Sequence, residues 1–515
     1  MSHFTFIDIP DDEFDVPATR WERRRRIRRW VALVTSAVLA ATLVAWGGTQ
    51  LVTHRCRWLD FSLAKAGGEC VGVTNEKAFL FDGANHDAAY ADVLDKIATE
   101  NRWVRAQWEQ ARHPYVRVAL MMPMSSTAGS PFTPGQVLHS LQGAYTALYR
   151  ANHTTDVRDP TPLVQLLLAN EGSSQAQWRR VVAALVPMAG QEHPLVAVVG
   201  LGVSIPETAQ AAGELGKKDI PTVGAVLSSN DIVADRLFRI SPSNRDYATA
   251  IQHYLDDQSK LRPEQLRGFL LWDTNKDDNY VRDLRNAFEQ QLSGYIQNRR
   301  ASYVGQLKRS KSETAVLFAR PVDEICQAQP DVIFFAGRVR DLIPFILSLA
   351  DRSCGTDRRL TILTGATGLS AVEENQDVIP ALKSGKIDLL HAASADASHW
   401  VQGVGRPPGF AGFLNMFRNR GFTDRSLRDG YAIMHHDAVL MAIWATRLVT
   451  EQGGAARPAD TFRSMQDLKA VPGASGTLSF DDKPGGWPKG KPVPVVRIPA
   501  DQSDLITPVY IAREG

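Results

Sequence analysis

Residues 195–226 read LVAVVGLGVSIPETAQAAGELGKKDIPTVGAV. A run of apolar residues ends in a glycine turn at 200–204, a stretch of helix-forming residues follows, and a second apolar run begins near residue 220. Two buried strands joined through a helix form a βαβ unit, in which the strands lie parallel. This stretch therefore predicts an α/β fold with at least one parallel sheet.

The same alternation extends in both directions from this unit. Nearly continuous apolar runs, most of them separated by helical stretches, indicate strands that are buried on both faces of a parallel sheet. About 385 residues carry the pattern. Because this is more chain than a single sheet with its helices contains, two lobes are expected. The predicted strands are 116–122, 163–170, 195–200, 220–226, 267–273, 331–337 and 360–365.

The glycine turn places Gly200, Gly202 and Ser204 where a strand meets a helix N-terminus. Backbone N–H groups at such a place attract an anion or a carboxylate. As a dinucleotide-binding fingerprint the turn is weak, because Ile205 stands where the third glycine of the G-x-G-x-x-G pattern is required.

Signatures of catalysis are missing from the sequence. It contains no G-x-S-x-G, no phosphate-binding P-loop and no H-E-x-x-H, so we predict neither an enzyme nor a cofactor. His435, His436 and Asp437 are adjacent and fan out around a helix, which predicts a solvated face and not a metal site. Asp273, Asp277 and Asp278 lack the glycine and the closing glutamate of a calcium loop.

Composition excludes several further classes of protein. The chain has 515 residues, 22% of them charged and 44% hydrophobic, which is typical of folded domains and not of disordered ones. Lys and Arg number 58 and Asp and Glu number 56, a net charge of +2. No global positive field exists, so nucleic acid is not expected as a partner.

A charge-free stretch at 31–52 follows seven arginines in residues 1–30. Twenty-two helical residues span roughly 33 Å, the thickness of a bilayer core. The positive-inside rule then places residues 1–30 in the cytoplasm and residues 53–515 outside a cell membrane that is crossed once. A cleaved signal peptide is the alternative, although the 30-residue basic region is long for one. Residues 53–114 form a juxtamembrane segment with one amphipathic helix near 87–110.

All four cysteines lie on the predicted outer side, where disulfides form. Pairing between neighbours in the sequence is expected, which joins Cys56 to Cys70 and Cys326 to Cys354. No Cys/His spacing typical of a metal site is present.

The order of these segments resembles the type I periplasmic-binding fold, in particular the substrate-binding proteins of branched-chain amino acid ABC transporters and related receptor ligand-binding domains. The resemblance covers about residues 115–500. It is carried by VRVALMMPMSSTAG from residue 116, GQVLHSLQGAYTALYRAN (135–152), VVGLGVSIPETAQAA (198–212), IPTVGAVLSSND (220–231), LFRISPSNRDYATAI (237–251), DVIFFAG (331–337), HHDAVLMAIWA (435–445) and GASGTLSFDD (473–482).

The resemblance implies two lobes joined by three hinge crossings that close over a ligand. Lobe 1 is expected at about 115–262 and 391–470, lobe 2 at 263–390 and 471–500, and a C-terminal tail at 501–515. By the same resemblance, the ligand-binding residues are Ser125, Gly202, Ser204, Ser228, Ser229 and Tyr280, with Val281 in place of the glycine that usually follows the tyrosine.

The resulting hypothesis is a membrane-anchored extracellular solute-binding protein or receptor, partnered by an ABC permease or a signalling protein. The rival hypothesis is a tethered scaffold whose binding fold contacts a protein and whose N-terminal tail recruits a cytoplasmic partner. Amino-acid binders of this fold carry an acid after the strand that corresponds to 360–365. Here no carboxylate occurs before Glu373, so the expected ligand is a small polar molecule, neutral or anionic, and not an ordinary α-amino acid, unless Asp273 supplies the acid.

Overall fold

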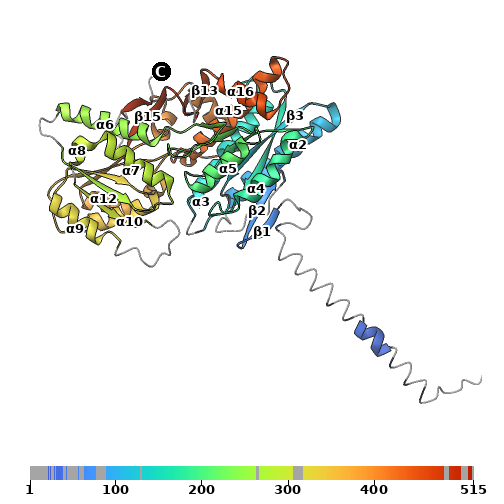
Figure 1. The fold of residues 1–515 in the computed structure, drawn as a ribbon, viewed down its shortest axis with the longest axis horizontal. Coiled ribbons are helices and arrows are strands. Elements are labelled where there is room, and N and C mark those ends of the chain that lie inside the picture. The colour runs from blue at the N-terminus through green and yellow to red at the C-terminus, as the bar shows by residue number, and fades with distance from the viewer. Residues whose placement is uncertain are drawn as a thin grey trace, which may run out of the picture.

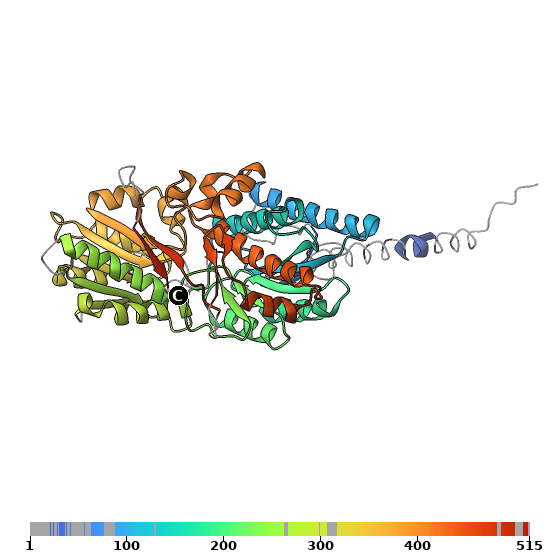
Figure 2. The same ribbon diagram turned by 90° about the horizontal axis from the view of Figure 1, so that it is seen from above.

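A computed structural model describes residues 63–76, 88–127, 130–261, 266–297, 299–305, 317–480, 486–499 and 508–512, together with Cys56 and residues 21, 24, 28, 30–36, 38 and 42. These residues build two α/β lobes that lie side by side along the long axis of the molecule (Figures 1 and 2). Each lobe has its own seven-stranded sheet, so the predicted α/β class is confirmed.

The first lobe is built on a sheet with the strand order β1-β2-β4-β3-β5-β6-β7. Its helices cover both faces of the sheet, which explains why the parallel strands are apolar throughout. The parallel strands are β3 (Tyr115–Met122), β4 (Leu163–Asn170), β5 (Leu195–Gly200), β6 (Thr222–Gly224) and β7 (Leu237–Arg239). One face packs on α2 (Ala88–Ala111), α3 (Pro134–His153), α14 (Phe410–Asn419) and α15 (Tyr431–Glu451), and the other on α4 (Trp178–Leu185) and α5 (Pro206–Gly216).

The second lobe has the strand order β16-β15-β12-β11-β10-β8-β9. Strands β8 (Gly268–Asp273), β9 (Arg300–Tyr303), β10 (Val332–Ala336), β11 (Leu360–Gly365) and β12 (Ile387–Ala392) are parallel. Strands β15 (Lys491–Ile498) and β16 (Val509–Ala512) add antiparallel to the β12 edge. Helices α6 (Asn244–Leu261) and α7 (Asn279–Gln291) cover one face, and α9 (Ala319–Ala328), α10 (Val339–Ala350), α11 (Ser370–Glu373) and α12 (Val378–Ser384) cover the other.

The chain passes between the lobes three times. It leaves the first lobe after β7, returns after β12, and leaves again between β14 (Gly476–Leu478), which pairs with β13 (Val471–Gly473), and β15. Helix α6 contacts β11, β12, β15 and β16, so it belongs to the second lobe, although the boundary expected near residue 262 places it in the first. Residues 509–512 form β16 and are not a free tail.

The burial of residues 435–437 and the number of strands both differ from the expectations. His435, His436 and Asp437 were expected on a solvated face, and that prediction is wrong, because all three side chains are fully buried. Helix α15 is covered on several sides, by α3, by α16 (Pro458–Gln466), by β5 and by the turn at 473–475, so it has no polar face along this stretch. Several strands were missed, among them β7, β9, β12 and β15, since short or mixed stretches lack a clear apolar run.

The segment before residue 115 is part of the first lobe. Strands β1 (Leu63–Ala66) and β2 (Glu69–Thr74) form an antiparallel hairpin, and β2 pairs with β4, so the hairpin extends the first sheet. The helix expected at 87–110 is α2. None of the described helices is long and apolar enough to cross a bilayer. Most of the expected span at 31–52, and most of the tail at 1–30, lies outside the described residues.

Both expected disulfides are confirmed. Cys56 is bonded to Cys70, with Cα atoms 5.5 Å apart. Cys326 at the end of α9 is bonded to Cys354 after α10, with Cα atoms 5.6 Å apart.

Candidate functional site

A cavity of about 240 Å³ lies between the two lobes. The first lobe contributes the start of α3 and the turns after β5 and β6, and the second contributes the starts of α7 and α10 and the turn after β11. These are carboxyl ends of parallel strands or the helices that follow them, the usual ligand-binding edge of an open α/β sheet. Its polar lining residues are Thr133, Gln136, Ser204, Tyr280, Arg338, Arg340, Thr367 and Tyr431.

Ser204 reaches the cavity at the end of the glycine turn. Gly200, Leu201 and Gly202 all have positive φ angles, of 92°, 62° and 64°. A Cβ atom on Gly202 would lie 2.5 Å from Nε2 of Gln175, so a larger residue there would displace the buried Gln175 side chain and would be strained at this positive φ. Ser204 Oγ accepts a hydrogen bond from Ser229 N at 3.3 Å, and its carbonyl accepts one from Tyr280 N of the other lobe at 3.2 Å.

Arg338 is the most completely enclosed charge in the cavity wall. Its Nε and Nη2 atoms donate to the two oxygens of Asp278 at 2.7 and 2.8 Å, and its guanidinium lies 4.8 Å from the centre of the Tyr280 ring. Asp278, fully buried, also accepts from Tyr280 N at the start of α7. The neighbouring carboxylate raises the pKa of Arg338, so this residue keeps its positive charge. The Tyr280 hydroxyl donates to the carbonyl of Gly365, and burial raises its pKa, so it stays neutral.

Direct contacts hold the two lobes together around the cavity. Arg340 of the second lobe donates to the carbonyl of Ser130 in the first. Ser229 Oγ donates to Asn279 O at 3.2 Å, and Asn230 N donates to Asp283 Oδ2 at 2.9 Å. The structure therefore represents a closed arrangement of the lobes.

Four of the six predicted ligand-binding residues lie outside the cavity lining. Ser204 and Tyr280 line it, from opposite lobes. Gly202 shapes the turn. Ser228 and Ser229 lie in the contact between the lobes, where Ser228 O accepts from Asn244 N at 2.8 Å. Ser125 donates to Glu69 Oε2 at 2.5 Å and is fully buried away from the cavity.

Residues that the sequence analysis missed supply most of the remaining polar lining. Arg338 and Arg340 follow directly on the strand predicted at 331–337, and Thr367 follows the strand predicted at 360–365. The general rule that ligands meet the carboxyl ends of strands points to these positions. Tyr431 begins α15, and no sequence pattern predicts that it lines the cavity.

Acidic side chains are excluded from the cavity wall, because none of the described residues that line it is an Asp or a Glu. Asp273 lies nearby, but its Oδ1 accepts from Gly305 N and Asn275 N at 2.7 and 2.9 Å, and burial raises the pKa of its carboxyl. No cluster of three or more potential metal ligands occurs within the described part of the chain. The wall therefore suits a neutral or negatively charged group.

Comparison with family models gives no match, and neither does comparison with curated protein sequences. Solved structures do match. A leucine-binding protein from Thermotoga maritima superposes with a TM-score of 0.53 at 15% identity, over 78% of this chain and 99% of that one. A periplasmic binding protein type 1 from Bordetella pertussis superposes with a TM-score of 0.53 at 12% identity, over 77% of this chain and all of that one. This chain has the type I periplasmic-binding fold.

A third structure with this fold is a solute-binding protein of an ABC transporter from Rhodopseudomonas palustris, in complex with p-hydroxybenzoic acid. It superposes with a TM-score of 0.56 at 14% identity, over 78% of this chain and 98% of that one. At such identities the similarity establishes the periplasmic-binding fold and its two-lobed design.

Proposed function

We propose that this chain is a membrane-anchored solute-binding protein that closes its two lobes over a small neutral or anionic molecule, without chemical conversion. The observation that carries the proposal is the cavity between the lobes, where Ser204 and Gln136 of one lobe face Tyr280 and Arg338 of the other. A ligand that contacts both lobes stabilises the closed arrangement, because it binds that arrangement better than an open one.

The charge of the wall selects the class of ligand. An ammonium group buried here would lie against Arg340 and against Arg338, whose guanidinium already occupies both oxygens of Asp278, and no lining carboxylate is left to pair with it, which costs several kcal/mol. A carboxylate would instead lie near the guanidinium groups, and the apolar part of a small acid would contact Val203, Val226 and Ile343. The fold's known ligands include both leucine and p-hydroxybenzoic acid, and the wall of this cavity favours the second kind.

The described part of the N-terminal segment supports the membrane anchor. Residues 30–36 are helical, and the side chains of Trp30, Val31, Leu33 and Val34 are more than half exposed, which is unfavourable in water. Thr35 Oγ1 donates to the carbonyl of Val31 at 2.7 Å, so this hydroxyl needs no water. These features suit a helix surrounded by lipid.

Calorimetry on the full-length chain in detergent tests the binding proposal. We expect benzoate or p-hydroxybenzoate to bind, and leucine and isoleucine to bind weakly or not at all. Ala371→Trp fills the cavity from the start of α11 and should abolish binding, whereas Ala411→Trp on the exposed face of α14 should leave it unchanged. A micromolar Kd for leucine would refute the charge argument, and no binding by any small solute would favour a protein-binding scaffold.

A further inference from the structure

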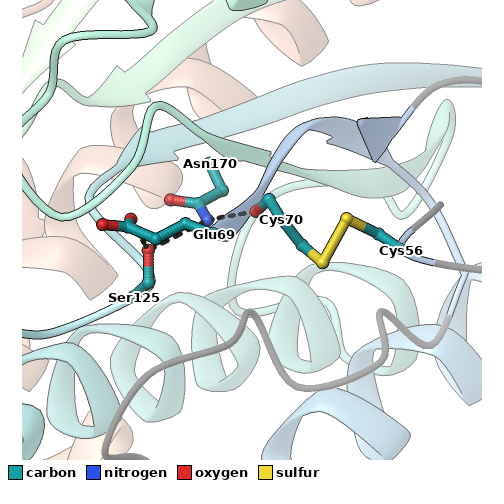
Figure 3. Close-up of a disulfide and its surroundings, with 5 residues drawn as sticks. All are labelled: Cys56, Glu69, Cys70, Ser125 and Asn170. Atoms are coloured by element: carbon teal, nitrogen blue, oxygen red, sulfur yellow. Dashed lines mark hydrogen bonds between the residues drawn. A yellow bond between two sulfur atoms is a disulfide. The ribbon is translucent and has the colours of Figure 1, made fainter. Parts of the chain in front are cut away.

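The segment that precedes residue 115 supports one wall of the ligand cavity. Its hairpin β1–β2 contacts the loop after β3, at residues 123–127, through Glu69 and Ser125 (Figure 3). Its helix α2 contacts the same loop through a tyrosine side chain. This loop continues through Pro131 and Thr133 into α3, and both residues line the cavity.

Glu69, at the start of β2, makes the central contact. Its Oε2 atom accepts hydrogen bonds from Ser125 Oγ at 2.5 Å and from Ser173 N at 2.6 Å, and its Oε1 atom accepts from Ser173 Oγ. Ser125 follows β3 and Ser173 follows β4, so one carboxylate joins two loops at the carboxyl edge of the first sheet. Hydrogen bonds to a charged acceptor are about twice as strong as neutral ones.

Two further residues of the same segment contact this loop directly or through Asn170. The carbonyl of Cys70 accepts from Asn170 Nδ2 at 2.7 Å, and Asn170 Oδ1 accepts from Met124 N at 2.9 Å. Tyr90 of α2 donates through its hydroxyl to the carbonyl of Met124 at 2.8 Å. The disulfide from Cys70 to Cys56 connects this group to the chain four residues beyond the expected membrane span.

The far end of the loop meets the second lobe. The carbonyl of Ser130 accepts the hydrogen bond from Arg340, a residue of the cavity wall. Ser126 Oγ donates to the carbonyl of Phe132 at 3.0 Å, which ties the supported end of the loop to the end that lines the cavity. Ser125 and Ser126 at one end of the loop are thus connected to the end that contacts the second lobe.

We propose that Glu69 is a positioning residue for the ligand cavity, and that the Cys56–Cys70 disulfide makes this support part of the membrane attachment. The ligand-affinity part of the proposal and the link to a membrane attachment rest on the proposed function, and the loop-positioning part does not. The physical reason is that three donors from the loops after β3 and β4 converge on one carboxylate of a hairpin that the disulfide holds in place.

Hydrogen exchange of the full-length chain in detergent, without ligand, tests the positioning. Glu69→Gln places an amide N–H against donors, and we expect the peptides that contain residues 123–127 and 170–178 to exchange about tenfold faster. The double variant Cys56→Ser with Cys70→Ser should accelerate the same peptides. Lys65→Gln, exposed on the same hairpin, and Cys326→Ser with Cys354→Ser in the other lobe are the matched controls and should leave them unchanged.

Faster exchange confined to the hairpin itself, or equal in all variants, would overturn the positioning role.

A second measurement concerns affinity, with p-hydroxybenzoate as the probe. We expect roughly three- to tenfold weaker binding in Glu69→Gln, partial recovery in Glu69→Asp, and wild-type binding in Lys65→Gln. If the wild-type chain does not bind the probe, the proposed function fails, and the exchange result still decides the role of Glu69. If Glu69→Gln binds the probe with the affinity of the wild type, Glu69 does not position the cavity wall.

Discussion

His435 is a neutral histidine in the core of the first lobe. Its Nδ1 atom contacts the carbonyl of Tyr431 at 2.9 Å, while Nε2 has no partner and the side chain is fully buried. Burial lowers its pKa from 6.5 to about 4. Between these pH values the unfolded chain binds a proton at this histidine that the folded chain does not. His435 therefore leaves the free energy of unfolding unchanged above pH 6.5 and lowers it as the pH drops towards 4.

We expect this residue to account for a loss of roughly 3 kcal/mol between pH 6.5 and pH 4. Denaturant unfolding of the full-length chain across this range should show a shallower loss for His435→Gln than for the wild type. His253→Gln, at an exposed position, is the control and should keep the wild-type profile. Identical profiles for all three proteins would mean that His435 is protonated in the folded chain.

Helices α3 and α15 form the closest helix pair of the first lobe, and a glycine permits their approach. A Cβ atom on Gly143 of α3 would lie 1.9 Å from the carbonyl oxygen of Ala432 on α15. The backbone of neither helix can move without displacing the sheet or the cavity residue Tyr431 at the start of α15. Glycine at 143 is therefore a packing requirement.

Gly143→Ala should lower the stability of the first lobe by about 3 kcal/mol, the upper range for overpacking a core. Gly213→Ala in α5 is the matched control, because a Cβ atom there meets nothing within 4 Å. It should stabilise the chain by about 0.5–1 kcal/mol through better helix propensity. Thermal midpoints measured by circular dichroism should thus shift in opposite directions, and a shared direction would contradict the packing argument.

The proposed anchor determines where the cleft between the lobes lies relative to a membrane. Only four residues separate the expected end of the span at residue 52 from Cys56, and a fully extended chain of that length covers about 14 Å. Because Cys56 is bonded to the first lobe through Cys70, this lobe should stay close to the membrane surface while the second lobe moves.

Fractionation of cells that express the full chain checks the anchor. We expect full-length protein in the membrane fraction, with residues 53–515 accessible to protease from outside. Replacement of Arg23 to Arg26 by neutral residues should weaken this orientation, as a C-terminal topology reporter would show. A mature N-terminus located beyond residue 52 would establish a cleaved signal peptide and rule out the anchor.

The α/β class, the two sheets and both disulfides could be predicted from the order of the residues alone. Long apolar runs such as 163–170 and 195–200 are buried on both faces, so their pattern needs no knowledge of neighbours. Cysteines close in sequence meet through local geometry, which is why their pairing could be predicted. The turn that carries Ser204 was recognisable because glycines in sequence report positive φ angles.

Which polar side chains meet could not be predicted, because it depends on how the two lobes and their helices pack. Ser204 and Arg338 lie far apart in the sequence and share a cavity only because two lobes close on one another. Ser125 and Ser229 carry the same kind of hydroxyl, yet one binds Glu69 and the other binds Asn279. The burial of His435 to Asp437 likewise depends on the elements packed around α15. Contacts of this kind depend on the relative placement of distant segments, which local patterns of residues do not encode.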